Sequence, residues 1–453
     1  MSKAPTNERI LEETARFPDL VDLVVDGAGN RAFLTKDGRA LLQYEQDGGG
    51  STLIPDKGEG VAWALPDFRA IKADYDGLKA GRTHPDSMFM NIREALAARA
   101  ALPTDDYYDL LTAWIFHTYR QDWLDYSPVL FLFGVSERGK SRIGKTIAFM
   151  SYRGIPTGTL NEAALFWWPD RFEPTLFVDV VDVKKKAMAR GSLDTLCNRF
   201  ERGHKELRIN PEKAGSQVFR THAPFGPTIL ASNEMLDERF TSRGLFLVPP
   251  NAPGVYKKPH ESDLVRRRAM LTAWRWWTMA EEQAPDPNVR GAGTGRWQDI
   301  TQPLRQITAM VAPDRLPAVD AALAHLYRER QEQKGRTTDA ELLRAVVLVR
   351  RVQADLGKDT AVSTEDVRDQ FEKLAGWPKP PGARYVGIHL QALGFQAVKL
   401  EGGLKRGWAC RPERFDDLVR QYGLEDGWTD RGQIEGQIEA VPALSGSDRK
   451  TDG

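Results

Sequence analysis

One short segment constrains the fold of this chain more than any other. The apolar run Val129–Phe133 leads into Gly134, and Gly139, Lys140 and Ser141 follow in the string VLFLFGVSERGKS. The run predicts a buried strand, and the apolar pattern after Ser141 predicts a helix. Glycine suits a loop that wraps an anion, because a Cβ atom would keep backbone N–H groups away from it. The segment therefore predicts a strand–loop–helix unit with an anion at the amino end of the helix.

The GxxxxGK[ST] spacing is the P-loop pattern, which predicts ATP as the ligand. We expect Lys140 to reach the β- and γ-phosphates of ATP and Ser141 to bind Mg²⁺. The residues expected to bind the nucleotide are those of the loop and the first helical turn: Gly134, Val135, Ser136, Glu137, Arg138, Gly139, Lys140, Ser141 and Arg142.

A second, overlapping register also satisfies this pattern, with Gly139, Gly144, Lys145 and Thr146. No strand directly precedes Gly139 in that register. Its loop would also overlap the loop of the first register, because the two share Gly139, Lys140 and Ser141. We therefore expect Lys145 and Thr146 to be ordinary residues of the helix.

Two further apolar runs end in polar side chains. The string PTLFVDVVDV places Asp179 after Leu176–Val178, where a carboxylate can hold the Mg²⁺ ion of a bound nucleotide. The string GPTILASN ends at Asn233, which can sense the γ-phosphate and position the attacking water. A simpler interpretation of Asn233 is that it caps the following turn.

Catalysis is less clearly marked than binding. Arg243 stands just before the apolar run GLFLVP, in the position of an arginine finger that reaches the ATP of a neighbouring subunit, with Arg239 as the reserve candidate. A solvated arginine is the alternative. Val180 follows Asp179, where ATPases usually have a glutamate that polarises water. Hydrolysis is therefore expected either to use Asp182 or a neighbour, or to be slow. The predicted catalytic residues are Lys140, Asp179, Asn233 and Arg243.

Strand-like runs alternate with helical patterns over residues 128–250, which predicts an α/β sheet domain. The expected parts of the chain are a small β-rich module at 1–88, an α/β core with lead-in helices at 89–258, a helical region at 259–335, a separate small domain at 336–423 and a polar, disordered tail at 424–453.

Composition excludes few functions. Lys and Arg number 63, as do Asp and Glu, so the net charge is zero and any nucleic-acid surface must be local. The two cysteines, Cys197 and Cys410, form no metal-ligand spacing and fit a reducing cytosol. No apolar run reaches the ~18–20 residues of a membrane span, and the N-terminus lacks a signal-peptide pattern. We expect a cytoplasmic protein without a membrane partner.

The chain resembles AAA+ P-loop ATPases of helicase type from phages, plasmids and other mobile elements, and a related ATPase family of unknown function often found in such elements. The likeness covers roughly residues 100–423 and rests on four strings: DDYYDLLTAWIFHTYRQDWLDYSPVLFLFGVSERGKSR, NEAALFWWPDRFEPTLFVDVVDV, GPTILASNEMLDERFTSRGLFLV and GIHLQALGFQAVKLEGGLKRGWACRPERFDDLVRQYG. The string GRWQDITQPLRQI is similar to a lid segment, which implies a sensor 2 role for Arg296 and its contact with the nucleotide.

The resemblance implies an AAA+ three-layer sandwich with a helical lid and a C-terminal winged helix. It also implies a homo-oligomeric ring, most often a hexamer, with ATP at the subunit interfaces and DNA as the polymer substrate, held single-stranded in a central pore.

Two groups of basic residues are candidates for DNA contact. In ring helicases of this kind a hairpin before the sensor strand projects basic residues into the pore, and the matching segment carries Lys205, Arg208 and Lys213. Interleaved glutamates make a solvated surface the alternative. In the small C-terminal domain Arg384 precedes a candidate recognition helix, and Lys405 and Arg406 flank a candidate wing. Winged helices also mediate protein contacts.

Two functions remain open. The first is an ATP-dependent DNA motor or helicase for the replication of a phage or mobile element. The second is a nucleotide-dependent assembly or switch ATPase with slow hydrolysis, such as an origin-binding loader or a phage-defence component.

Overall fold

A computed structural model describes most of the chain and divides it into two compact units, residues 1–326 and 327–453. The helix α11 (Leu316–Gly335) crosses this division, which falls a few residues before the expected domain boundary at 335/336. The described residues are 10–45, 51–56, 62–135, 137–158, 165, 167–179, 192–209, 219–233, 238–251, 254–335, 337–355, 361–375, 382–400 and 405–424.

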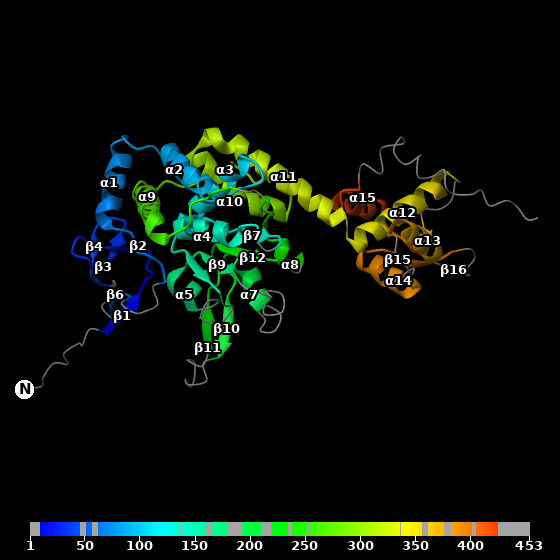
Figure 1. Cartoon of the computed structure of the whole chain (residues 1–453). Helices are drawn as coiled ribbons and strands as arrows, with labels where there is room; N and C mark the ends of the chain where they lie inside the picture. The colour runs from blue at the N-terminus through cyan, green and yellow to red at the C-terminus, as the bar shows by residue number, and fades with distance from the viewer. Residues whose placement is uncertain are drawn as a thin grey trace, which may run out of the picture. The chain divides into compact units, whose positions relative to one another are not determined.

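A five-stranded sheet forms the centre of the first unit, in the order β13-β7-β12-β9-β8 (Figure 1). All neighbouring strands in it are parallel. Four of the strands were predicted from their apolar runs, and the fifth, β8, is too short to give one. The strands are β7 (Val129–Phe133), β8 (Ile155–Thr157), β9 (Leu176–Asp179), β12 (Thr228–Ser232) and β13 (Gly244–Leu247).

Helices cover both faces of this sheet, which explains why its strands are apolar on both sides. Leu130 and Leu132 belong to the main core, whereas Val129 and Phe131 belong to a smaller cluster on the opposite face. The helices with residues in the main core are α1 (Phe68–Lys79), α2 (Pro85–Ala97), α3 (Asp106–Tyr119), α4 (Lys140–Met150), α9 (Glu261–Ala280), α10 (Arg296–Val311) and the first part of α11; those with residues in the smaller cluster are α7 (Ser192–Asn198) and α8 (Glu238–Thr241). The architecture is therefore α/β, as expected.

The N-terminal residues form two small sheets that pack onto the rest of the first unit. One has the order β1-β6-β5, with β1 and β6 parallel, and the other is the antiparallel set β2-β3-β4. Their strands are β1 (Ile10–Thr14), β2 (Leu20–Val25), β3 (Arg31–Thr35), β4 (Ala40–Leu41), β5 (Tyr44–Glu45) and β6 (Ser51–Pro55). The structure differs from the expected β-rich module in one respect: residues Phe68–Lys79 form the helix α1, which packs against α9.

A buried ion pair ties this N-terminal part to the core. Arg153, just after α4, and Asp22 of β2 are each 1% exposed, and the Arg153 Nε donates to the Asp22 carboxylate at 2.8 Å. The same guanidinium also donates to the backbone oxygens of Ala15 and Phe172. The N-terminal strands are thus part of the same buried interior as the central sheet.

We expect Asp22→Ala to lower the free energy of unfolding by about 3–5 kcal/mol, because Arg153 would be left charged and unpaired in the interior. Urea denaturation measures this loss. The matched control is Asp76→Ala, which removes an exposed pair with Lys72 and is expected to cost only about 0.5 kcal/mol. Similar losses in the two variants would contradict the structural role of the buried pair.

The second unit combines helices with a small three-stranded sheet. Its antiparallel sheet has the order β14-β16-β15. Trp408 is 3% exposed in this unit's core, and its indole lies against Gly387, where a Cβ atom would come within 3.0 Å of the ring. The elements are α12 (Thr338–Asp355), β14 (Val362–Ser363), α13 (Thr364–Ala375), α14 (Ala383–Ala392), β15 (Gln396–Leu400), β16 (Lys405–Ala409) and α15 (Pro412–Gln421).

Among the helices within the described residues, none combines the length and the apolar character that crossing a bilayer requires.

Candidate functional site

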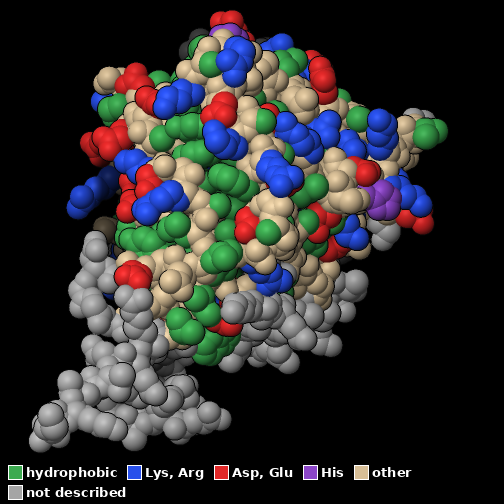
Figure 2. Space-filling model, turned by 90° about the vertical axis from the view of Figure 1, so that its left-hand side faces the viewer, with side chains coloured by type: hydrophobic (Ala, Val, Ile, Leu, Met, Phe, Trp, Pro, Cys, Tyr) green, Lys and Arg blue, Asp and Glu red, His purple; other side chains and the backbone are tan. Residues whose placement is uncertain are grey.

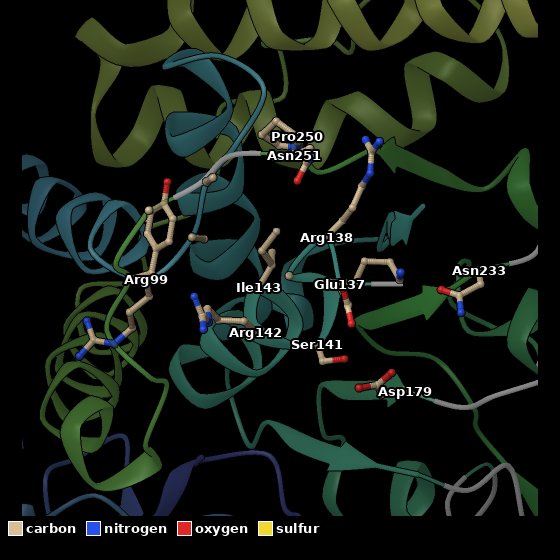
Figure 3. A pocket seen from close by; sticks show the side chains of 16 residues that line it. Arg99, Glu137, Arg138, Ser141, Arg142, Ile143, Asp179, Asn233, Pro250 and Asn251 are labelled. Atoms are coloured by element: carbon tan, nitrogen blue, oxygen red, sulfur yellow. The ribbon is translucent and has the colours of Figure 1, made fainter. Parts of the chain in front are cut away.

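The predicted site residues gather at one edge of the central sheet. Because β7, β9 and β12 are parallel, their carboxyl ends meet there, and they deliver the loop after Gly134, Asp179 and Asn233. A pocket of about 530 Å³ opens at this edge. Its lining residues are Arg99, Ala100, Ala101, Glu137, Arg138, Gly139, Lys140, Ser141, Arg142, Ile143, Asp179, Asn233, Pro250, Asn251, Gly254 and Tyr256 (Figure 3).

The loop between β7 and α4 has an unusual backbone. Gly134, Glu137 and Gly139 have φ angles of 147°, 69° and 77°. Glycine adopts this region without strain, whereas Glu137 does so at an energetic cost. Gly139 is the N-cap of α4 and has no side chain to satisfy the first N–H groups, and the first helical turn contains no acidic residue. The amino end of α4 is therefore open to an anion.

Lys140 lies beneath this loop and is 9% exposed. Its Nζ donates to the backbone oxygens of Gly134 and Val135, both at 2.7 Å. Burial lowers the pKa of Lys140, the charge of Asp179 opposes that change, and Arg138 adds to it. The ammonium thus lies close to the acid of β9 and points into the loop that surrounds it.

The residues of the second, overlapping register lie mostly within α4. Lys145 and Thr146 lie inside α4, as predicted, and the Thr146 hydroxyl donates to the backbone oxygen of Arg142. Gly144 is a packing position, because a Cβ atom there would come within 2.3 Å of the Phe177 ring on β9. The second glycine of that overlapping register, Gly144, therefore allows α4 to pack close to the strand that carries Asp179.

We expect Gly144→Ala to destabilise the protein by about 1–3 kcal/mol, because the added methyl group would overpack the contact with Phe177. Alanine favours a helix interior by up to ~1 kcal/mol over glycine, so a net loss would show that the packing term dominates. Urea denaturation measures the change. Gly158→Ala is the control, since nothing lies within 4 Å of its added Cβ atom, and a loss equal to that of Gly144→Ala would count against the packing argument.

The donors fit a magnesium ion bound together with a nucleotide. Ser141 of α4 and Asp179 of β9 lie next to each other in the pocket (Figure 3). Mg²⁺ takes oxygen ligands and usually combines one or two protein groups with phosphates and waters. Among the described residues no group of three or more Asp, Glu, His or Cys side chains is arranged to hold a metal. Such an ion, when bound, would neutralise charge on the phosphates.

Eight lining residues were not predicted: Arg99, Ala100, Ala101, Ile143, Pro250, Asn251, Gly254 and Tyr256. Ile143 belongs to α4, directly after the predicted residues, and the other seven come from the segment just after α2 and from the segment after β13. The Lys257 N–H joins these two segments by donating to the Ala98 oxygen at 3.0 Å. Arg138 extends from the loop toward the same segment, with its Nη1 at 3.4 Å from the Pro249 oxygen. No local pattern marks the residues of these two segments, because only tertiary packing brings them to the pocket.

Two predicted arginines lie at the opposite edge of the sheet. Arg243 precedes β13, and its backbone oxygen accepts from the N–H of Val129 at the start of β7. Arg296 opens α10 and donates from Nη1 to the Ser242 hydroxyl at 2.8 Å. A four-residue strand separates the two edges by ~13 Å. This position does not support the prediction that Arg296 binds the nucleotide of its own chain, and the role of Arg243 toward a neighbouring chain stays a prediction.

Six predicted residues do not line the pocket or lie outside the part of the chain that the structure describes. Gly134 and Val135 contribute the carbonyls that Lys140 contacts rather than lining the pocket. Ser136, Val180, Asp182 and Lys213 lie outside the described residues.

The predicted hairpin before the sensor strand is present. The strands β10 (Glu206–Ile209) and β11 (Phe219–His222) pair antiparallel and project from the central sheet (Figure 1). Lys205 is exposed just before β10, and Arg208 lies in β10 opposite Arg220. In the second unit, Arg384 is exposed in the first turn of α14, and Lys405 and Arg406 are in β16, opposite Leu400 and Lys399.

Basic side chains are also frequent elsewhere on the surface. Figure 2 shows one face, on which Lys and Arg lie among Asp, Glu and hydrophobic side chains rather than in one continuous basic field. This agrees with a net charge of zero.

The fold and the pocket define a class: an α/β protein with a polar pocket at the carboxyl edge of a parallel sheet. No protein-family model matches the chain, and no curated protein matches it. Among solved structures, the A form of the NrS-1 C-terminal region without ligand is 11% identical, with 82% of each chain covered and a TM-score of 0.37. Another apo structure of that region is also 11% identical, covers 81% of this chain and 82% of that chain, and has a TM-score of 0.36. At these values the likeness carries no information about the chemistry of the pocket.

Proposed function

We propose that this chain is an AAA+ ATPase that works on DNA as a motor of phage or mobile-element replication. One observation carries the proposal. The parallel strand order brings the GxxxxGKS loop, Asp179 and Asn233 around a single pocket, although they are far apart in sequence. A phosphate-binding loop, an acid and a polar residue at three strand ends are groups that bind and orient the phosphates and Mg²⁺ of ATP.

The charge of the pocket favours a polyanion. Its lining includes four cationic side chains and two carboxylates. Lys140 and Arg142 lie in the first turn of α4, where positive charge opposes the helix dipole and an anion would be stabilising. A nucleoside triphosphate would supply negative charge both to the cationic side chains and to the amino end of α4, and its metal ion would lie beside the carboxylates. This supports ATP as the ligand.

Each residue then has a distinct role. Lys140 would contact the β- and γ-phosphates, and Ser141 and Asp179 would hold Mg²⁺. Asn233 would position the attacking water. Arg243, on the far edge of the sheet, would stabilise the transferring phosphoryl group in the pocket of a neighbouring subunit, which requires a homo-oligomeric ring.

The DNA-facing part of the proposal rests on two basic elements. The hairpin β10–β11 offers Lys205 and the strand residue Arg208 to a polyanionic backbone. In the second unit, the order α12, β14, α13, α14, β15, β16 supports a winged helix in which α14 is the recognition helix. Arg384, Lys405 and Arg406 would then contact phosphates.

A second function, the slowly hydrolysing switch, is favoured by one observation. Among the described residues of the pocket, the carboxylates are Glu137 and Asp179, and Val180 follows Asp179 in the sequence. A switch needs nucleotide binding and oligomerisation but little turnover.

Lys140→Ala is expected to weaken binding of a fluorescent ATP analogue about 10- to 100-fold, because charge-assisted contacts to the phosphates would be lost. Fluorescence titration with Mg²⁺ present measures the affinity. Lys145→Ala is the matched control, since Lys145 lies exposed on the same helix and should change affinity no more than about twofold. Equal effects in the two variants would contradict the proposed register.

The motor and the switch differ in turnover. A motor should show an ATPase rate that rises on addition of single-stranded DNA, and it should displace a strand from a forked duplex with ATP. A switch should hydrolyse ATP near the background rate with or without DNA. Steady-state phosphate release and a strand-displacement assay measure these, with Lys140→Ala as the inactive control. Failure on every fork substrate by a protein that binds ATP would reject the motor and leave the switch.

A further inference from the structure

Arg199 follows α7 and is a fully buried cation with four neutral acceptors. It is 0% exposed. Its Nη1 donates to the Pro224 oxygen at 2.8 Å, its Nη2 to the Pro174 and Pro227 oxygens at 3.2 and 3.1 Å, and its Nε to the Thr228 hydroxyl at 2.7 Å. One guanidinium therefore binds oxygens from two chain segments that are far apart in sequence, Pro174 before β9 and residues 224–228 between β11 and β12.

Burying the charge of Arg199 is energetically unfavourable, so the side chain does more than fill space in the core. Burial lowers the pKa of Arg199 to about 9, which reflects the unfavourable transfer of its charge from water. An apolar side chain of similar volume would avoid that penalty. What only arginine offers is a planar fork of donors that reaches several carbonyls at once. Its geometry, rather than its charge, accounts for its position.

The backbone around Arg199 is shaped to receive the guanidinium. Gly226 has a φ angle of 154°, and a Cβ atom there would come within 3.0 Å of the Arg199 Nη2. The Gly226 N–H donates in turn to the Arg199 backbone oxygen at 3.2 Å. A side chain at position 226 would push the guanidinium away from its acceptors.

The acceptors belong to segments with different tasks. Pro174 precedes β9, Pro227 precedes β12, and Thr228 is the first residue of β12. Asp179 and Asn233 lie at the opposite ends of these two strands. Pro224 follows β11 of the hairpin. A shift of β9 or β12 therefore reaches Arg199 directly, and Arg199 holds the end of the hairpin.

The other side of the hairpin is fastened to the strand that leads into the phosphate loop. The Ser127 N–H, just before β7, donates to the Phe200 oxygen at 2.8 Å. The Arg202 Nε donates to the Leu124 oxygen at 3.0 Å. The base of the hairpin is thus anchored at the amino ends of β7, β9 and β12, the three strands whose carboxyl ends form the pocket.

We propose that Arg199 is a positioning residue that couples the nucleotide pocket to the β10–β11 hairpin, so that the hairpin responds to the nucleotide state. This inference rests on the proposed function, because it takes the pocket to bind ATP and the hairpin to contact DNA. Arg199 touches neither ligand. It acts by joining the strand ends opposite the pocket to the base of the hairpin.

Hydrogen–deuterium exchange of the full chain tests this directly. With Mg²⁺ and a slowly hydrolysed ATP analogue, exchange at residues 206–209 and 219–222 should change relative to the nucleotide-free protein. In Arg199→Met the analogue should still bind with nearly unchanged affinity, but the nucleotide-dependent change in the hairpin should fall about tenfold. Stimulation of ATP hydrolysis by single-stranded DNA should fall with it, while the basal rate stays.

Two further variants keep the test informative. Thr228→Val removes one acceptor with little change in volume, so it should weaken the hairpin response partly even if Arg199→Met folds poorly. Arg268→Met removes another fully buried arginine, which donates to the Ala64 and Phe149 oxygens. As the matched control it should lower stability but leave the hairpin response intact.

Each outcome separates the two proposals. If the wild-type protein fails to bind the analogue, the proposed function is wrong. If it binds the analogue and the hairpin does not respond, or if the response survives in Arg199→Met, the coupling role of Arg199 is wrong while ATP binding stands. Equal loss of the response in Arg268→Met would also overturn the coupling role, because it would show a general effect of destabilisation.

Discussion

Parallel pairing of β7 with β12, and of β12 with β9, is the constraint on which the rest of this structure depends. Parallel strands end at the same edge of a sheet, so polar groups that follow three separate apolar runs are brought together without any contact between them in sequence. The pairing needs apolar strands covered on both faces, and the helices of the first unit supply that cover. Pocket and hairpin attachments then lie at opposite ends of the same strands.

The N-terminal strands are part of this interior rather than an appendage. Asp22 meets Arg153 behind α4, and β2 also receives Arg275 of α9, which donates to the Val21 oxygen at 2.9 Å. An unpaired polar group in the interior is strongly destabilising, so these contacts favour the one arrangement of the helices and strands in which every donor keeps its acceptor. They fix α4 and α9 relative to each other at the end remote from the pocket.

Much of the fold was predictable because its signals are local. Buried strands such as Val129–Phe133 appear as continuous apolar runs, and Asp179 and Asn233 follow such runs directly. The helix α1 also has a local signal, because Phe68, Ile71, Tyr75 and Leu78 recur at helical spacing, although it lies in the part of the chain predicted to be β-rich. Arg99 and Tyr256 carried none, since their place beside the pocket depends on how α2 and the segment after β13 pack. Charge was the least informative signal, because Arg199 lies in a stretch of sequence rich in basic residues and is nevertheless completely buried.

The contacts of Lys140 with its own loop have a consequence for exchange of the ligand. The ammonium has two carbonyl partners in its own loop, so a phosphate bound as proposed would compete with these carbonyls for the same donor group. Part of the attraction between lysine and phosphate would be offset by breaking these bonds, and departure of the phosphate would restore them. Under the proposed function, a loop that satisfies its own lysine would lower the affinity of the site for nucleotide and favour release of the product over its retention.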